Sequence, residues 1–236
     1  MNGALEVVRH SPLTGIFLTL LAYRLAIALN RRCHGHPLTN TVLVGVLLVM
    51  LALWATGMQY QQYMEGARFI HLLLGPATVA LAVPLYDNLH HLKRNAPALL
   101  IALVVGGIAG ILSGAALGML FGLPRPILLS ILPRSATTPI AMGIAEQIGG
   151  IPSVAAACVI VTGIVGAALF GPLRQSLRRL DDLTLGFATG IAAHGVGTAR
   201  ALQLSETAGA FAGLAMGLNG LFTAVLVPLI CSILRL

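Results

Sequence analysis

The chain has 236 residues, of which 57% are hydrophobic and 9% are charged, and its mean hydropathy is +0.92. A soluble domain carries about 25% charged residues. An outer-membrane barrel is built from strands in which apolar and polar residues alternate, whereas the apolar segments of this chain are continuous. Both classes are therefore excluded. The net charge of +7 would suit a nucleic-acid-binding protein, but most Lys and Arg residues form short clusters between apolar segments. We interpret these clusters as loops on the cytoplasmic side of a membrane, where Lys and Arg are enriched, and expect no nucleic-acid partner.

The first part of the chain contains two apolar segments joined by polar residues. We expect membrane spans over about 12–30 and 39–57. Arg31 and Arg32 follow the first span and place that end in the cytoplasm. Residues 59–68 are amphipathic and aromatic, which is typical of a helix lying at the opposite membrane interface.

Three later apolar segments are interrupted by proline, glycine or charged residues. They cover about 69–89, 133–152 and 183–204. Irregular backbone at membrane depth is tolerated only where protein or a water-filled cavity surrounds it. We therefore expect broken or re-entrant helices in these segments.

Uninterrupted spans are expected over about 97–121, 152–173 and 208–234. Together with the broken segments they predict an all-α polytopic membrane protein. We expect about six to eight membrane segments in a single transporter-like domain over residues 1–236.

An internal repeat is visible in the middle of the chain. Residues 75–89 align with 134–148, and each stretch is followed by a glycine-rich span. Basic residues precede the first of these spans and follow the second, so the two spans should run in opposite directions. Inverted repeats with broken helices are typical of secondary transporters.

The central segment holds the first candidate binding residues. Thr138-Pro139 predicts the start of a helix inside the membrane, whose free N–H groups would attract an anion. Arg134 could hold a carboxylate through its guanidinium, although it could also extend to the interface as an anchor. Ser135, Thr137 and Thr138 are candidate substrate ligands, with the alternative that the threonines only satisfy freed backbone groups. Thr78 joins them as the counterpart of Thr137 in the repeat.

Further candidates carry ionisable side chains. Glu146 could transfer a coupling proton if it is buried, or could pair with Arg200 or Arg134. His194 and Arg200 lie in the last interrupted segment and could bind substrate, although a lone histidine is often a packed hydrogen-bonding residue. No Ser/His/Asp order, phosphate-binding loop or Cys/His spacing is present, so we expect no enzyme activity, cofactor or metal.

Three motifs in order resemble the LrgB/CidB family, including its YohK-like bacterial members. They are Leu74–Tyr86, Leu132–Pro152, and His194–Leu202 with Ala215–Leu218. The resemblance covers nearly the whole chain and implies a multi-pass protein of the bacterial inner membrane. Gly195 stands where this family leads us to expect alanine.

The resemblance implies two different functions. One is the transport of small monocarboxylates such as glycolate, glycerate or pyruvate, as implied by the related plastid glycolate/glycerate translocator. The other is holin-like or antiholin-like regulation of murein hydrolases and lysis with a small LrgA/CidA-type membrane partner. The interrupted, charged segments favour a transporter, because a simple holin needs none of them. We also expect the chain to form a homo-oligomer.

Overall fold

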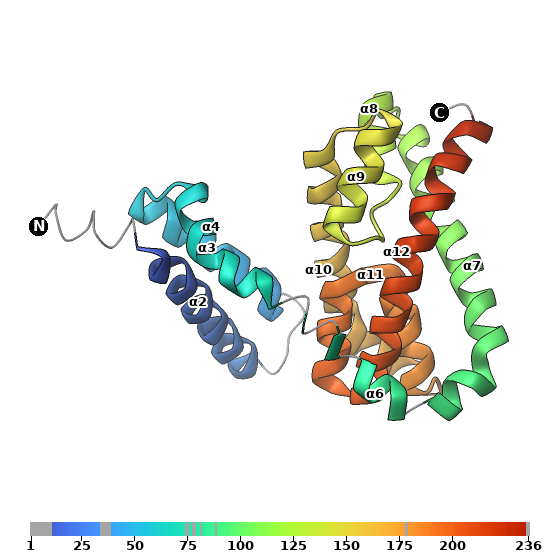
Figure 1. Cartoon of the computed structure of the whole chain (residues 1–236), viewed down its shortest axis with the longest axis horizontal. Helices are drawn as coiled ribbons and strands as arrows, with labels where there is room; N and C mark the ends of the chain where they lie inside the picture. Colours follow the sequence, from blue (N-terminus) through green and yellow to red (C-terminus); the bar gives the residue numbers. More distant parts are fainter. Residues whose placement is uncertain are drawn as a thin grey trace, which may run out of the picture. The chain divides into compact units, whose positions relative to one another are not determined.

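A computed structural model describes residues 11–33, 39–73, 76, 79–80, 82–87, 89–177 and 179–234. All regular structure in these ranges is helical, which confirms the expected all-α class (Figure 1). The chain divides into two compact units, Met1–Ala80 and Leu81–Leu236. Each unit is described by itself, and the expectation of a single domain stays a prediction.

The first unit contains α2 (Pro12–Arg32), α3 (Thr41–Thr56) and α4 (Tyr60–Leu72). Helix α2 packs against both others. Its Gly15 faces the α4 backbone at Gly66 and Ala67, where a side chain would collide. These three helices match the two spans and the amphipathic segment that the sequence predicts.

The second unit begins with α6 (Ala82–Asp87) and continues through six further helices. They are α7 (Leu89–Leu120), α8 (Arg125–Ile131), α9 (Thr138–Ile148), α10 (Pro152–Ser176), α11 (Asp182–Leu204) and α12 (Glu206–Leu234). Helix α7 begins earlier than the predicted span and contains Pro97 within its first three turns. Helix α8 was not predicted, whereas the boundaries of α10, α11 and α12 agree with prediction to within about three residues.

Four helices, α2, α7, α10 and α12, are long and apolar enough to cross a membrane. Large apolar side chains remain exposed along them, among them Leu100 and Val105 of α7 and Leu221 and Val225 of α12. A soluble surface rarely exposes such continuous apolar area, whereas a lipid-facing one must. The protein is therefore a polytopic membrane protein, as predicted.

The segment from 133 to 152 is interrupted as expected. Helix α8 ends at Ile131, residues 132–137 are not helical, and α9 starts at Thr138. In Figure 1 the non-helical connection lies partway down the second unit, and α9 returns to the end at which α8 lies. The two helices thus form a re-entrant hairpin. Thr137 occupies the N-cap position, but its side chain makes no capping hydrogen bond.

Helix α11 is a second re-entrant hairpin, because its direction reverses at His194 (φ 41°, ψ −136°). Gly186 packs on Ala208 and Gly190 on Ala212, so the first half of α11 follows α12 in the same direction. A Cβ on Gly197 would lie 3.3 Å from the carbonyl oxygen of Thr189. A straight helix would separate these residues by roughly 12 Å, so the second half folds back along the first.

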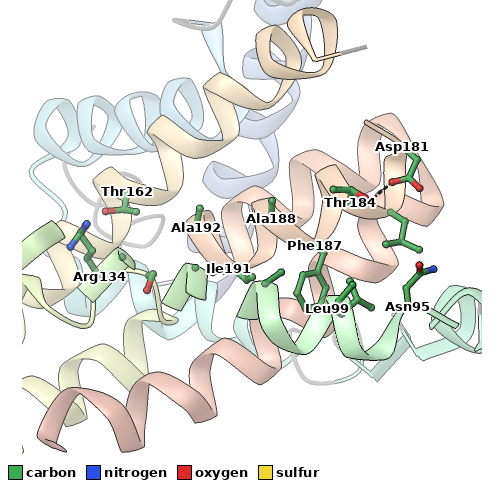
Figure 2. Close-up of a pocket in the computed structure, with 16 residues that line it drawn as sticks. Asn95, Leu99, Arg134, Thr162, Asp181, Thr184, Phe187, Ala188, Ile191 and Ala192 are labelled. Atoms are coloured by element: carbon green, nitrogen blue, oxygen red, sulfur yellow. Dashed lines mark hydrogen bonds between the residues drawn. The ribbon is translucent and has the colours of Figure 1, made fainter. Parts of the chain in front are cut away.

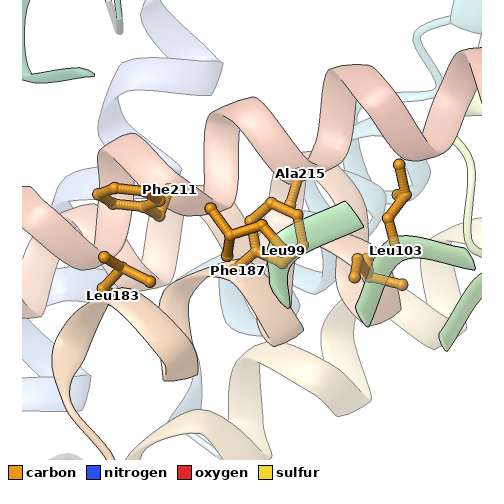
Figure 3. Packing of buried hydrophobic residues seen from close by; sticks show 7 residues of the cluster. Leu99, Leu103, Leu183, Phe187, Phe211 and Ala215 are labelled. Carbon is orange, nitrogen blue, oxygen red and sulfur yellow. The ribbon is translucent and has the colours of Figure 1, made fainter. Parts of the chain in front are cut away.

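The basic clusters gather at one end of the second unit. Leu99 of α7 packs with Leu183 and Phe187 of α11 in one apolar cluster, which also contains Phe211 (Figure 3). The start of α7, with Lys93 and Arg94, therefore lies beside the start of α11, and Arg174 of α10 pairs with Asp182 at 3.0 Å. Helices α7 and α10 run in opposite directions, as predicted for the glycine-rich spans. The remainder of the proposed repeat includes residues outside the described ranges and stays a prediction.

Asp181 caps α11, since its Oδ1 accepts a 2.8 Å hydrogen bond from the Thr184 amide. Hydrogen bonds from the Thr184 side chain and backbone lower the pKa of this carboxyl. Replacing Asp181 with Ala should lower the free energy of unfolding at pH 7 by about 0.5–2 kcal/mol. Because the folded pKa is the lower one, the stabilisation is present at neutral pH and is lost as the pH falls below about 4.

Thermal unfolding in detergent at pH 7 and at low pH measures this difference. Asp181→Asn is the matched control, because asparagine also caps helices but does not titrate. A loss of stability in Asp181→Ala that is equal at both pH values would contradict the cap as the source of the effect.

Candidate functional site

The two re-entrant hairpins meet at Asn219 in the middle of α12. Its side chain is fully buried, and its Nδ2 donates to the carbonyl oxygens of Ser135 and Ile191, each at 3.2 Å. Ser135 lies in the break between α8 and α9, and Ile191 lies three residues before the reversal of α11. One amide group therefore connects both irregular segments by donating to a backbone carbonyl of each.

Arg134 lies beside this junction and extends towards α7. Its Nη2 donates to Ser113 Oγ at 3.2 Å, and that hydroxyl in turn donates to the carbonyl oxygen of Gly110 at 3.0 Å. The guanidinium occupies the space where a side chain of residue 114 would begin, so glycine there accommodates the observed position of Arg134. Arg134 Nη1 is buried without a hydrogen-bond partner in the described part of the chain. Such a group lacks an acceptor, which an anionic ligand would supply.

A cavity of about 450 Å³ extends from Arg134 between α7, α10 and α11. Figure 2 shows Arg134 and Thr162 at one end, and Asn95, Asp181 and Thr184 at the other. Small residues form much of its wall: Ala98, Ala102, Gly106 and Gly110 on α7, and Ala188 and Ala192 on α11. The volume lies in the range of about 300–1,000 Å³ that is usual for small-molecule sites.

A second cavity of about 360 Å³ lies between α7, α8 and α10. It is lined by apolar residues and by Cys158, and Arg134 and Thr162 border both cavities. Arg134 therefore stands at the junction of the two spaces.

The larger cavity reaches the end of the unit that carries the basic residues. The distribution of Lys and Arg predicts that this is the cytoplasmic end. Towards the opposite end, α7, α8, α9 and α12 pack together through one apolar cluster: Ile111, Ala115, Leu129, Leu132, Ile144, Val227 and Cys231. The arrangement provides a route from the basic end of the unit to Arg134 and a packed barrier beyond it.

The structure brings only two of the predicted binding residues to these cavities, Arg134 and Ser135. Thr137 and Thr138 line neither cavity, so the expected convergence of the α9 amides with Arg134 on one carboxylate is not observed. Thr78 lies outside the described residues.

The other candidates lie elsewhere in the second unit. His194 is buried, and its ring Nε2 is 2.8 Å from the carbonyl oxygen of Val159, as in a packed structural histidine. Arg200 Nη1 donates to Gln203 at 3.2 Å. Glu146 is exposed near the end of α9, so the burial that its proton-coupling role required is absent. No group of three His, Cys, Asp or Glu residues within the described ranges could hold a metal ion.

Sequence analysis missed Ser113 and Thr162. Each is a polar residue in an apolar span, which is a weak signal because such residues commonly join helices. Their proximity to the chain breaks is what distinguishes them, and only the folded chain supplies it.

A family comparison matches residues 19–233 to the LrgB-like family. The chain belongs to this family. The resemblance of its three motifs is thereby confirmed over most of the sequence.

Individual relatives agree with the family assignment. A Bacillus subtilis protein, YxaC, is 38% identical over 216 residues, which cover 91% of this chain and 93% of the relative. Proteins named antiholin-like protein LrgB from Bacillus cereus and Bacillus anthracis are 32% identical over 219 residues, covering 93% of this chain and 95% of each relative. No solved structure matches the chain.

Replacing Asn219 with Ala should lower the free energy of unfolding by about 1–3 kcal/mol, because two buried carbonyl groups lose their donor. Amide hydrogen exchange should accelerate around 133–137 and 191–195. Thr223→Val is the matched control, since Thr223 is equally buried one turn away and its hydroxyl has no partner among the described residues. Equal destabilisation by both substitutions would contradict a specific role for Asn219.

Replacing Gly114 with Ala should also destabilise the protein, by about 1–3 kcal/mol, because the new Cβ collides with the Arg134 guanidinium. Gly143 of α9 has no atom within 4 Å of its Cβ position, so Gly143→Ala should leave the melting temperature unchanged or raise it. Melting of both variants in detergent tests the contact, and a neutral Gly114→Ala would show that the guanidinium moves aside freely.

Proposed function

We propose that the protein is a secondary transporter that carries small monocarboxylates, such as glycolate, glycerate or pyruvate, by efflux or exchange. The observation that carries this proposal is that Arg134 lines a cavity of about 450 Å³ and that its buried Nη1 has no hydrogen-bond partner among the described residues. A carboxylate oxygen of the substrate would supply the missing hydrogen-bond acceptor for Nη1.

The chemistry of the guanidinium suits a carboxylate. Two of its nitrogens can bind the two oxygens of a carboxylate in one plane. In Arg134 the contact of Nη2 with Ser113 fixes the orientation of the group and leaves Nη1 for a ligand. The small residues of the cavity wall leave room for a ligand of a few carbon atoms but provide few polar partners for a larger one.

The hairpins support a carrier over an open pore. Carriers place their sites at broken helices near the bilayer midplane, where two structural elements can rearrange around the substrate. Here the break after α8 and the reversal of α11 meet at Asn219. A route open at the cytoplasmic end and closed by apolar packing beyond Arg134 corresponds to one state of alternating access.

Several finer assignments accompany this proposal. We propose a multi-pass location in a bacterial inner membrane, no enzymatic activity, and a homo-oligomeric assembly. A small LrgA/CidA-type membrane protein is a proposed partner. Family membership supports the location and the partner.

The second candidate function is antiholin-like regulation of murein hydrolase activity. The names of the Bacillus cereus and Bacillus anthracis relatives favour it. The two functions predict different behaviour in liposomes. A carrier saturates and shows counterflow, whereas a holin-like pore leaks unrelated solutes without either property.

Uptake of labelled glycolate, pyruvate and lactate into proteoliposomes containing the purified chain tests the proposal. Charge-assisted hydrogen bonds contribute about 1.5–3 kcal/mol, so Arg134→Ala should raise the half-saturating concentration by roughly ten- to a hundredfold. Arg134→Lys should lose less, because it retains the charge but not the planar fork.

Arg68→Ala is the control, because Arg68 is an exposed arginine of α4. Arg134→Ala and Arg68→Ala must first insert into the membrane and melt at the same temperature as the wild type, since loss of a structural charge would resemble loss of binding. An unchanged half-saturating concentration in folded Arg134→Ala would remove Arg134 from the site and direct the search to His194 and Arg200. Leakage of unrelated solutes without saturation would favour the second function.

A further inference from the structure

Thr162 of α10 is the second residue, with Arg134, that borders both cavities. Figure 2 shows its side chain near the Arg134 end of the larger cavity, away from Asp181 and Asn95. The described residues provide no hydrogen-bond partner for its hydroxyl. A half-buried hydroxyl without a partner, next to an arginine nitrogen without a partner, indicates that both groups meet one ligand.

The other hydroxyl groups near Arg134 are already engaged. Ser113 Oγ accepts from Arg134 and donates to Gly110. Ser135 Oγ is 3.4 Å from Asn219 Nδ2. Among the hydroxyl groups that line this end of the cavity, Thr162 is thus the one that makes no hydrogen bond within the described residues, which favours it as the partner for a polar substituent beside a bound carboxylate.

We infer that Thr162 is a specificity-determining residue that favours monocarboxylates with an oxygen on C2 over unsubstituted acids. This inference rests on the proposed function, because it requires a carboxylate on Arg134. C2 is bonded directly to the carboxylate carbon, so its oxygen lies at the same end of the ligand as the charge. A threonine hydroxyl can accept from a C2 hydroxyl or donate to a C2 keto oxygen.

Lactate, pyruvate and propionate form a matched set of ligands, because they share three carbons and a carboxylate and differ only at C2. A site with a hydroxyl placed for the C2 oxygen should bind lactate and pyruvate more tightly than propionate. One neutral hydrogen bond changes affinity by roughly three- to tenfold.

The chain provides its own reporter of binding at this place. Cys158 lines the second cavity together with Arg134 and Thr162, and it lies one helical turn before Thr162. The sequence contains three cysteines, so Cys33→Ser with Cys231→Ser leaves Cys158 as the single thiol. A bound carboxylate should slow the reaction of Cys158 with N-ethylmaleimide, and the half-protecting concentration reports affinity without requiring transport.

In the single-cysteine chain, lactate and pyruvate should protect Cys158 at lower concentrations than propionate. Thr162→Val keeps the shape of the side chain but removes the hydroxyl. It should raise the half-protecting concentrations of lactate and pyruvate roughly three- to tenfold and leave that of propionate unchanged. Thr162→Ser should keep the preference. Inhibition of labelled glycolate uptake by the same three acids provides a second measurement that does not depend on thiol reactivity.

The outcomes separate the two proposals. If Thr162→Val changes the values for all three acids equally, or changes none, the role of Thr162 is overturned while the anion site stands. If the protein with Thr162 intact binds propionate as tightly as lactate, the preference for a C2 oxygen is absent and the inference fails. If no acid protects Cys158 or inhibits uptake, the proposed carboxylate site fails and the inference fails with it.

Discussion

The second unit depends on one constraint, which is that interrupted helices inside an apolar environment must have partners for their free backbone groups. Asn219 meets this constraint for two interruptions at once, by donating to Ser135 and to Ile191. A side chain with two donors on a single nitrogen is suited to this position. The hairpin formed by α8 and α9 and the hairpin formed by α11 are thereby held against the same point of α12, and the cavity lies beside that point.

The guanidinium of Arg134 is oriented by Ser113 and accommodated by Gly114 but remains without an acceptor at Nη1. A protein that needed the arginine only for packing would gain stability from an acidic partner, since an unpaired buried donor costs about 1–3 kcal/mol. No such partner is present within the described residues, and Arg134 lines a cavity. These two observations are the physical basis for proposing an anionic substrate. Thr162 extends the same argument to the neutral part of that substrate.

Family membership and geometry emphasise different functions. The relatives named antiholin-like favour a regulator of lysis, whereas the hairpins, the cavity and Arg134 favour a carrier. The two are compatible in one respect, because a change in carboxylate flux could be coupled to a small membrane partner. A guanidinium with a buried, unpaired nitrogen beside a mostly apolar cavity nevertheless suits the binding of a small anion better than the formation of a pore, so transport is the function that these residues support more directly.

The sequence alone determined the all-α membrane class, most helix boundaries and the start of α9 at Thr138, because apolar periods and proline positions are local properties. It also predicted the interruptions before α9 and within α11, and it named Arg134 as a binding candidate, a role that stays a prediction. It did not foresee that Glu146 is exposed or that Thr137 and Thr138 line neither cavity, since burial depends on which helices become neighbours. Only tertiary packing decided that Ser113 and Thr162 are neighbours of Arg134. It also decided that α11 reverses at His194 and that Asn219 joins both hairpins. Contacts between residues as far apart as Ser135 and Asn219 are decided by how the hairpins fold against α12, which no local pattern records.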